Sequence, residues 1–206
     1  MRPTWWLLAL VALLVSGCGG DGPLEGKQWL QTNADRGGSL RAGEHRLPAG
    51  EVGDYTTYSM TIGNASDRDI RLTGASLVGA VGPIRLVDAY VVPPGRPFAY
   101  IASDGIFPPE TYDDPSSIEF VEMMEPLVGH VIEPSPGGDP RDHDYVIQFH
   151  VQIDGGEGVA GYVGSCVEFQ VGDSARIWQR CNDTLAFYAC LPPLDECDPD
   201  EALHGS

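Results

Sequence analysis

The sequence predicts an all-β protein, an antiparallel β-sandwich of immunoglobulin-like outline with at most one short helix. Apolar and polar residues alternate along several short runs, which is the pattern of half-buried strands. Turn-forming residues separate these runs, and the chain contains 26 glycines and 17 prolines. Seven or eight short strands with little helical periodicity are typical of two packed antiparallel sheets, with a small barrel as the alternative.

The run from Tyr145 to Ile153 is the clearest strand in the chain. Its odd-numbered positions are all apolar, and its even-numbered positions are mostly polar. One face is therefore expected to be buried and the other to be polar. His150 lies on the polar face between two glutamines, so we expect it to be exposed or to face a partner.

A second alternating run begins at Tyr55. Tyr58, Met60 and Ile62 are expected to face the core. The hydroxyl residues between them are expected on the opposite face: Thr57, Ser59 and Thr61. Further strands are expected at 70–78, 84–92, 98–101, 128–132, 159–171, 175–181 and 184–190. The one helical signal is the capping-box spacing of Ser116 and Glu119, ahead of residues 120–124.

The first residues have the composition of an export signal. Arg2 is followed by about eleven apolar residues, then by small residues and a cysteine, which is the order of regions in a signal peptide. The apolar run is too short to cross a bilayer core of about 30 Å, which needs roughly 20 apolar residues. We therefore expect this segment to direct export and to be removed.

The residues Val15-Ser16-Gly17-Cys18 resemble the lipobox of bacterial lipoproteins. In that family a small residue precedes a cysteine whose sulfur is lipidated before cleavage. The resemblance implies that Cys18 becomes the lipidated first residue of the mature chain. It also implies a cell-membrane location on the extracytoplasmic face, because two or three acyl chains anchor a protein stably.

Four regions follow from these patterns. Residues 1–17 are the lipoprotein signal peptide, and residues 18–50 are the lipidated cysteine and a flexible tether rich in turn formers. Residues 51–192 are the β-sandwich domain, and residues 193–206 are an acidic tail. Within the tether, residues 27–30 (Lys-Gln-Trp-Leu) are apolar enough to dock on the domain as an edge strand.

The charge balance excludes some partners. The chain has 12 basic and 30 acidic residues and a net charge of −18, which becomes −19 when Arg2 is removed with the leader. Such an acidic surface disfavours nucleic acid and anionic lipid headgroups. We therefore expect no nucleic-acid partner and membrane attachment through Cys18 alone.

Four cysteines besides Cys18 lie in the last quarter of the chain, which is typical of an exported protein with disulfides. If residues 172–175 form a hairpin loop, Cys166 falls opposite Cys181, where a disulfide is geometrically reasonable. Cys190 would then pair with Cys197 and hold the acidic tail. A zinc site is the alternative, but a Cys-x2-Cys pair is missing from the sequence.

Two sets of residues are candidate metal ligands. The first set could hold a hard cation or zinc: Asp142, His143 and Asp144. The second set has soft ligand types that suit copper: Met123, Met124 and His130. A solvated turn explains the first set without a metal, and packing in the core explains two members of the second.

The sequence contains no familiar catalytic motif. A nucleophile elbow, a zinc-protease helix, a phosphate-binding loop and a dinucleotide fingerprint are all missing from it. A triad assembled from distant residues is recognised by geometry and not by sequence order, so a hydrolase stays as a lesser alternative. We expect no catalytic residue and no cofactor.

These observations predict an exported, lipid-anchored surface protein that acts as a non-catalytic binding or interaction module at the cell envelope. The binding site is expected in the long irregular segment 103–144, because binding loops on rigid scaffolds are often long. Its candidate contact residues are aromatic: Phe107, Tyr112 and Phe120. The expected partner is an envelope protein or ligand, and a metal-handling lipoprotein for copper or a divalent cation is the main alternative.

Overall fold

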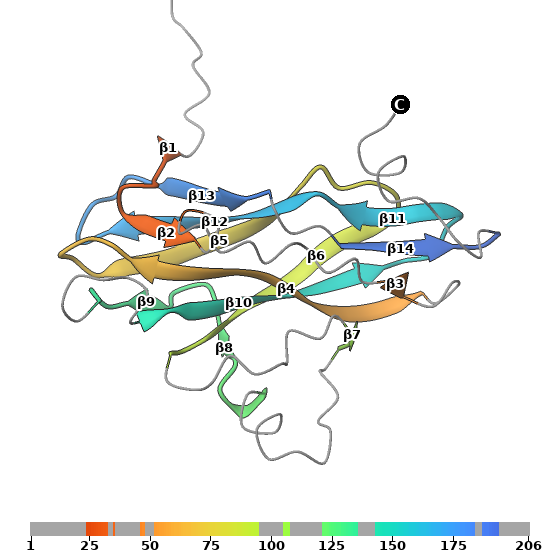
Figure 1. The fold of residues 1–206 in the computed structure, drawn as a ribbon, viewed down its shortest axis with the longest axis horizontal. Coiled ribbons are helices and arrows are strands. Elements are labelled where there is room, and N and C mark those ends of the chain that lie inside the picture. Colours follow the sequence, from red (N-terminus) through yellow and green to blue (C-terminus); the bar gives the residue numbers. More distant parts are fainter. Residues whose placement is uncertain are drawn as a thin grey trace, which may run out of the picture.

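The structure is a computed structural model of the chain. It describes residues 24–32, 35, 46–47, 52–94, 105–107, 121–135, 143–183 and 187–193. These residues form an all-β sandwich made mostly of antiparallel strand pairs (Figure 1), so the predicted fold class is confirmed. Within these ranges, no helix is both long enough and apolar enough to cross a bilayer.

Two sheets form the layers of the sandwich. The β12 sheet contains, in order, β1 (Leu24–Glu25), β13 (Trp178–Asn182), β12 (Gly164–Val171), β5 (Ile70–Val78) and β9 (Val131–Ile132). The β10 sheet contains, in order, β2 (Leu30–Thr32), β4 (Gly53–Asn64), β10 (Tyr145–Ile153), β6 (Ile84–Val92) and β8 (Glu125–Pro126), with β7 (Gly105–Ile106) also paired to β4. A third, three-stranded sheet consists of β11 (Gly158–Tyr162), β14 (Phe187–Leu191) and β3 (Arg46–Leu47).

The three long strands β4, β5 and β6 alternate between the two layers. β4 belongs to the β10 sheet, β5 to the β12 sheet and β6 again to the β10 sheet. Figure 1 shows β12 beside β13 in the upper part of the view and β4 beside β10 in the lower part. The core between the layers has large, fully buried side chains from both sheets, among them Phe149, Phe169, Ile147, Met60 and Leu72.

A β-bulge changes the predicted pattern of β4. The register with β10 shifts between Ile147, which pairs with Met60, and Gln148, which pairs with Tyr58. The extra residue, Ser59, breaks the alternation. Met60 and Ile62 are buried in the core as predicted. The three hydroxyl residues expected on the opposite face are buried too, so the half-buried pattern is wrong here: Thr57, Ser59 and Thr61.

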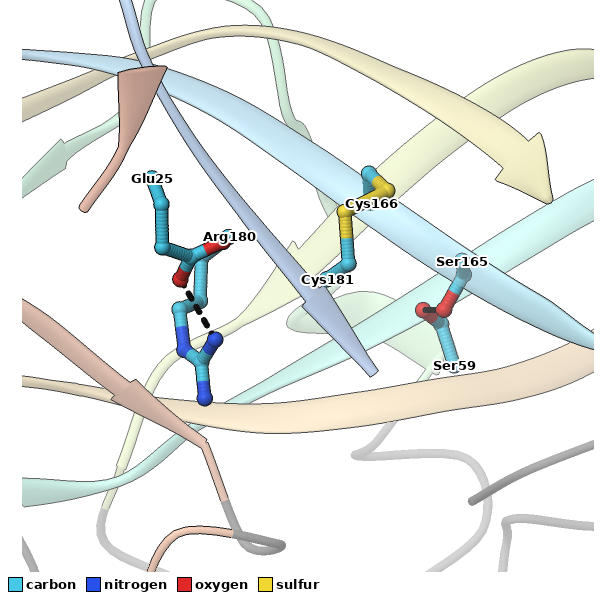
Figure 2. The surroundings of a disulfide bond; sticks show 6 residues. All are labelled: Glu25, Ser59, Ser165, Cys166, Arg180 and Cys181. Atoms are coloured by element: carbon cyan, nitrogen blue, oxygen red, sulfur yellow. Dashed lines mark hydrogen bonds and ion pairs between the residues drawn. A yellow bond between two sulfur atoms is a disulfide. The ribbon is translucent and has the colours of Figure 1, made fainter. Parts of the chain in front are cut away.

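The buried hydroxyls of β4 bond to the other two sheets, Thr57 to β11 and Ser59 to β12. Thr57 Oγ1 lies 2.6 Å from Tyr162 Oη, and Ser59 Oγ lies 2.6 Å from Ser165 Oγ. Figure 2 shows the hydroxyls of Ser59 and Ser165 facing each other between the sheets. Each pair satisfies polar groups that would be costly to bury alone.

The tether predicted for residues 18–50 is wrong in part, because several of its residues belong to the sandwich. β1 pairs with β13, β2 pairs with β4 and β3 pairs with β14. Leu30 is fully buried in the core, and the Trp29 ring packs edge-on against Trp178. Residues 27–30 therefore dock on the domain, but the edge strand is β2, which begins at Leu30, and residues 27–29 form a turn.

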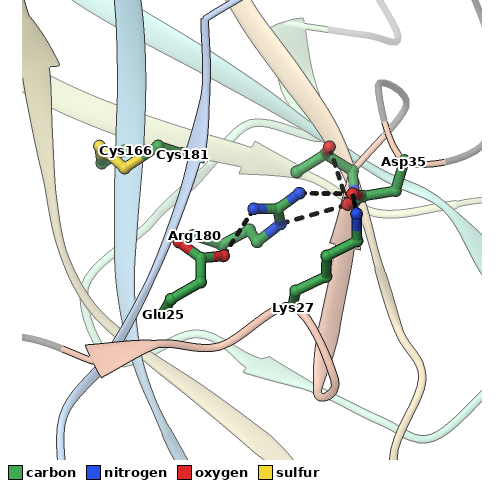
Figure 3. A network of polar contacts seen from close by, with 7 residues as sticks. Glu25, Lys27, Asp35, Cys166, Arg180 and Cys181 are labelled. Atoms are coloured by element: carbon green, nitrogen blue, oxygen red, sulfur yellow. Dashed lines mark hydrogen bonds and ion pairs between the residues drawn. A yellow bond between two sulfur atoms is a disulfide. The ribbon is translucent and has the colours of Figure 1, made fainter.

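We call residues 24–32 together with Asp35 the N-terminal clasp. It gives one strand to each sheet and so closes one side of the sandwich. Its polar centre is Arg180, which donates from Nη2 to Asp35 Oδ1 at 2.5 Å and from Nη1 to Glu25 Oε1 at 2.6 Å. Lys27 Nζ lies 2.9 Å from the same Asp35 oxygen (Figure 3).

The ion pairs of the clasp shift two pKa values. Burial alone would raise the pKa of Asp35, but hydrogen bonds from Arg180, the Thr32 N–H and Lys27 outweigh it and hold that pKa well below its ordinary value. Burial would lower the pKa of Arg180, yet the carboxylates of Asp35 and Glu25 raise it overall. Both groups are therefore charged at neutral pH.

The disulfide predicted between Cys166 and Cys181 is present. The two residues pair directly across β12 and β13, with Cα atoms 4.0 Å apart. Figure 2 shows the bond joining these two strands, and Figure 3 shows it on the other side of β13 from the Arg180 side chain. The predicted register of the hairpin is also correct. Moving three residues along each strand from the cysteines toward the turn leads to Phe169 and Trp178, and these two residues pair in the structure.

Most other strands lie where the sequence places them. β5, β6 and β10 match the predicted ranges, whereas the predicted run 159–171 is divided at Val163 into β11 and β12. The expected strand at 98–101 lies outside the described residues. Of the helical turn expected before Met124, only Val121 and Glu122 are described as helical.

Candidate functional site

The side of the sandwich opposite the clasp is only half closed. Residues 125–132, which we call the bridging segment, pass from β6 to β5 and give β8 to one sheet and β9 to the other. Leu127 is buried in the core, and its N–H donates to the Ala89 carbonyl at 2.9 Å. The bridging segment therefore closes the part of this side next to Leu72 and Ala89.

Gly129 is the point at which the bridging segment turns onto β5. Its N–H donates to the Leu72 carbonyl at 2.9 Å, and its φ of 91° lies in the region that favours glycine. Arg71 Nη1 donates to the Gly129 carbonyl at 3.3 Å and holds this turn. Beyond Leu72, no strand among the described residues pairs with the outer edge of β5.

A groove of about 660 Å³ lies beyond the bridging segment, between the open edges of β5 and β6. Apolar side chains from both sheets and from the bridging segment line it: Ala75, Leu77, Ile84, Leu86, Ala89 and Leu127. Most of them are only partly buried although they pack against the core. The core is thus accessible from this side, and the groove can accept apolar groups of another molecule.

The two strand edges beside the groove differ. β5 has a register shift at Thr73, but beyond it, from Gly74 to Val78, its register with β12 is unbroken and the strand has no charged residue. β6 has a register shift at Val87 and two charged residues, Arg85 and Asp88. Bulges and charges are the features that protect sheet edges from pairing, so β6 is the protected edge and β5 is the unprotected one.

The charges beside the groove are mainly negative. Arg85 is already paired with Asp154 at 3.1 Å and also bonds to Gln152. Glu168 lies over Gly74, since a Cβ at Gly74 would be 3.2 Å from Glu168 Oε2. Within the described ranges, Glu168 has no cationic partner.

Phe107, a predicted contact residue, lies on the outer face of the β10 sheet and not in the groove. Its ring stacks on His150, with centroids 3.8 Å apart and planes 6° apart, and also on Tyr90. Phe107 is therefore engaged within the domain. Tyr112 and Phe120, the other two predicted contact residues, lie outside the described residues.

The predicted exposure of His150 is wrong, although its predicted position on the polar face of β10 is correct. Its side chain is 11% exposed, with Nε2 2.8 Å from Asp54 Oδ1 and Nδ1 3.7 Å from Asp88 Oδ2. Burial, together with the Asp88 carboxylate, raises the pKa of Tyr90 next to it. His150 thus fixes Phe107 against the sheet.

The candidate metal ligands are not brought together in the described part of the chain. There, no three His, Cys, Asp or Glu side chains form a group that could hold a metal ion. His130 and His143 both lie edge-on against the ring of Tyr145, at 5.5 and 5.9 Å, and His130 Nδ1 is 3.1 Å from Glu125. Met123 and Met124 are half-buried, and Asp142 lies outside the described residues.

Two further predicted sites, the Cys190–Cys197 disulfide and the lipidated Cys18, involve residues outside the described ranges. Cys190 is disulfide-bonded, and its partner is not among the described residues. Cys197 and the lipidation site Cys18 both lie outside the described residues. The pairing of Cys190 with Cys197 and the lipid on Cys18 therefore stay predictions.

No protein-family model matches this chain, and no curated protein matches it. Its function is therefore inferred from its own geometry and chemistry.

The groove itself was not predicted from the sequence. Both strands that form it were expected, but their placement on open edges depends on long-range pairing. One signal was present: Gly74, Ala75 and Ser76 form a small, uncharged run inside a strand of a very acidic protein. Such a run is what an unprotected sheet edge looks like in sequence.

Proposed function

We propose that this protein is an exported, lipid-anchored, non-catalytic binding module of the cell envelope and that the groove between β5 and β6 is its binding site. The observation that carries the proposal is the half-closed side of the sandwich. A partly exposed apolar core beside an unprotected strand edge is a feature that soluble domains normally avoid.

Site-specific photo-crosslinking in cells that make the native, lipidated protein tests the site. A photo-reactive amino acid replaces Val128, which lines the groove and is 69% exposed. The matched control is Val52, which is 59% exposed and is not among the groove-lining residues. We expect a discrete adduct from position 128 and none from position 52. Equal adducts from both positions, or none from position 128, would contradict the proposed site.

The anchor is tested separately by mass spectrometry of the protein extracted from membranes. We expect a chain that begins at Cys18 with acyl groups on that residue, as the lipobox resemblance implies. A chain that keeps its leader, or an unmodified Cys18, would contradict the anchor without affecting the groove.

A further inference from the structure

We infer that the groove binds an extended peptide segment of a partner, which adds as a strand to the edge of β5 at residues 74–78 and has basic residues next to its apolar ones. This inference rests on the proposed function and specifies the chemistry of the partner. Main-chain hydrogen bonds give affinity in this mode of recognition, and pockets for alternate side chains give specificity.

The bridging segment shows that extended chain fits this side of the sandwich. Its residues pair with β5 at Ile70 and Arg71 and with β6 at Tyr90 and Val91. The segment first contacts β5 at Gly129, so no other described residue pairs with the outer edge of β5 beyond Leu72. A partner strand would continue the β12 sheet directly beyond the bridging segment.

The side-chain alternation of β5 defines what such a strand must present. Ala75 and Leu77 face the core, so residues opposite them would enter the apolar groove. Residues opposite Gly74 and Ser76 would lie on the outer face. The fitting peptide therefore has apolar side chains at every second position.

Glu168 determines which charge the peptide should have on its outer face. Gly74 has no side chain, so the Glu168 carboxylate lies over it and reaches toward the open edge. A lysine or arginine opposite Gly74 would pair with this carboxylate. The net charge of −18 also attracts a basic peptide over longer range and opposes the approach of a second copy of the chain.

The test uses the full chain and a short capped peptide of alternating leucine and lysine. Binding is measured by fluorescence anisotropy, and the site is located by amide hydrogen exchange. We expect slower exchange at residues 74–78 when the peptide binds. The control peptide has the same sequence with alternate backbone amides N-methylated, and it should bind more than about tenfold more weakly, because two or more hydrogen bonds are lost.

Two variants of the protein test the charge. Glu168→Gln should weaken binding of the lysine peptide about two- to fivefold, as expected for an exposed ion pair. Asp173→Asn makes the same change in net charge at an exposed position of the β12–β13 hairpin and should leave binding unchanged. A leucine–glutamate peptide should not bind.

Three results would overturn the inference: equal binding of the N-methylated peptide, protection of β6 residues 84–88 in place of β5, and protection of residues 74–78 in the absence of peptide through self-association. If crosslinking at position 128 succeeds in cells while the lysine peptide fails to bind, the inference fails and the proposed function stands. If position 128 gives no crosslink, the proposed function fails first.

Discussion

The two sides of this sandwich are closed by the same device with different results. On each side a segment crosses between the layers and gives one short strand to each sheet. The N-terminal clasp adds a buried ion pair and a tryptophan contact, and the Cys166–Cys181 disulfide joins the strands next to it. The contact between the bridging segment and β5 extends only as far as Gly129 and Leu72, and the groove remains.

The difference indicates that stability and binding are assigned to opposite sides. Leu30 on the clasp side is fully buried, whereas Leu86 beside the groove is only partly buried. Substitutions on the clasp side should therefore affect unfolding, and substitutions on the groove side should mainly affect binding. Five measurements test this separation.

The largest effect is expected for Arg180→Ala. The Asp35 side chain is 6% exposed, so loss of the guanidinium leaves a buried carboxylate with Lys27 as its main cationic partner. Breaking such a pair costs about 3–5 kcal/mol. Urea unfolding measures this loss, and a loss below about 1 kcal/mol would show that the clasp does not secure this side.

The disulfide comes next. Replacing both Cys166 and Cys181 with alanine opens a loop with a sequence separation of 15. In the chain-entropy model, a disulfide that closes a loop of this length contributes about 3 kcal/mol to the free energy of unfolding. Thermal and urea unfolding of the double variant against the oxidised parent measure the effect, and an unchanged midpoint would contradict it.

A matched leucine pair compares the two sides directly. Leu30→Ala should lower the free energy of unfolding by about 2–5 kcal/mol, because it leaves a cavity in a closed part of the core. Leu86→Ala should cost about 1 kcal/mol, because part of that side chain is already in contact with water. Equal losses of unfolding free energy would mean that the groove side is closed in solution.

The pH dependence of the clasp should be smaller. The pKa of Asp35 is lowered in the folded state, so its contribution is present above the unfolded value of about 3.9 and is lost as the pH falls toward the folded value. Unfolding free energy should thus fall by about 1 kcal/mol more between pH 5 and pH 3 in the parent than in Asp35→Asn. Parallel curves for the two proteins would contradict this assignment.

The smallest effect is expected for Arg85→Ala on the groove side. Arg85 and Asp154 form an ion pair in which both side chains are more than half exposed. Such pairs contribute about 0–1 kcal/mol, so the unfolding free energy should change by no more than about 0.5 kcal/mol. A loss comparable to that of Arg180→Ala would remove the contrast between the sides.

Local pattern was enough to predict much of the fold. The alternation from Tyr145 to Ile153 fixed both ends of β10, and the hairpin count placed Cys166 opposite Cys181. These features depend on residues close in sequence or on a single turn. The Ser59 bulge could not be predicted in this way, because it is set by the pairing of β4 with β10 about 90 residues later.

The candidate site was harder to predict for the same reason. Long irregular segments suggested a binding surface around Phe107, but that ring stacks on His150. The groove exists because β5 and β6 lie at adjoining edges of different sheets, and edge position is a property of the whole topology. Sequence composition pointed only to the absence of charge in Gly74–Ser76.

The position of β1 limits how the proposed anchor can hold the domain. Only the residues between Cys18 and Leu24 separate a lipidated Cys18 from the first paired strand, and chain of that length spans at most about 20 Å. β5 lies three strands further across the sheet than β1, about 15 Å at ordinary strand spacing. An anchor at Cys18 would therefore keep the clasp within about 20 Å of the bilayer. It would attach the domain at the edge of the sheet away from β5 and leave the unprotected edge free of the attachment point.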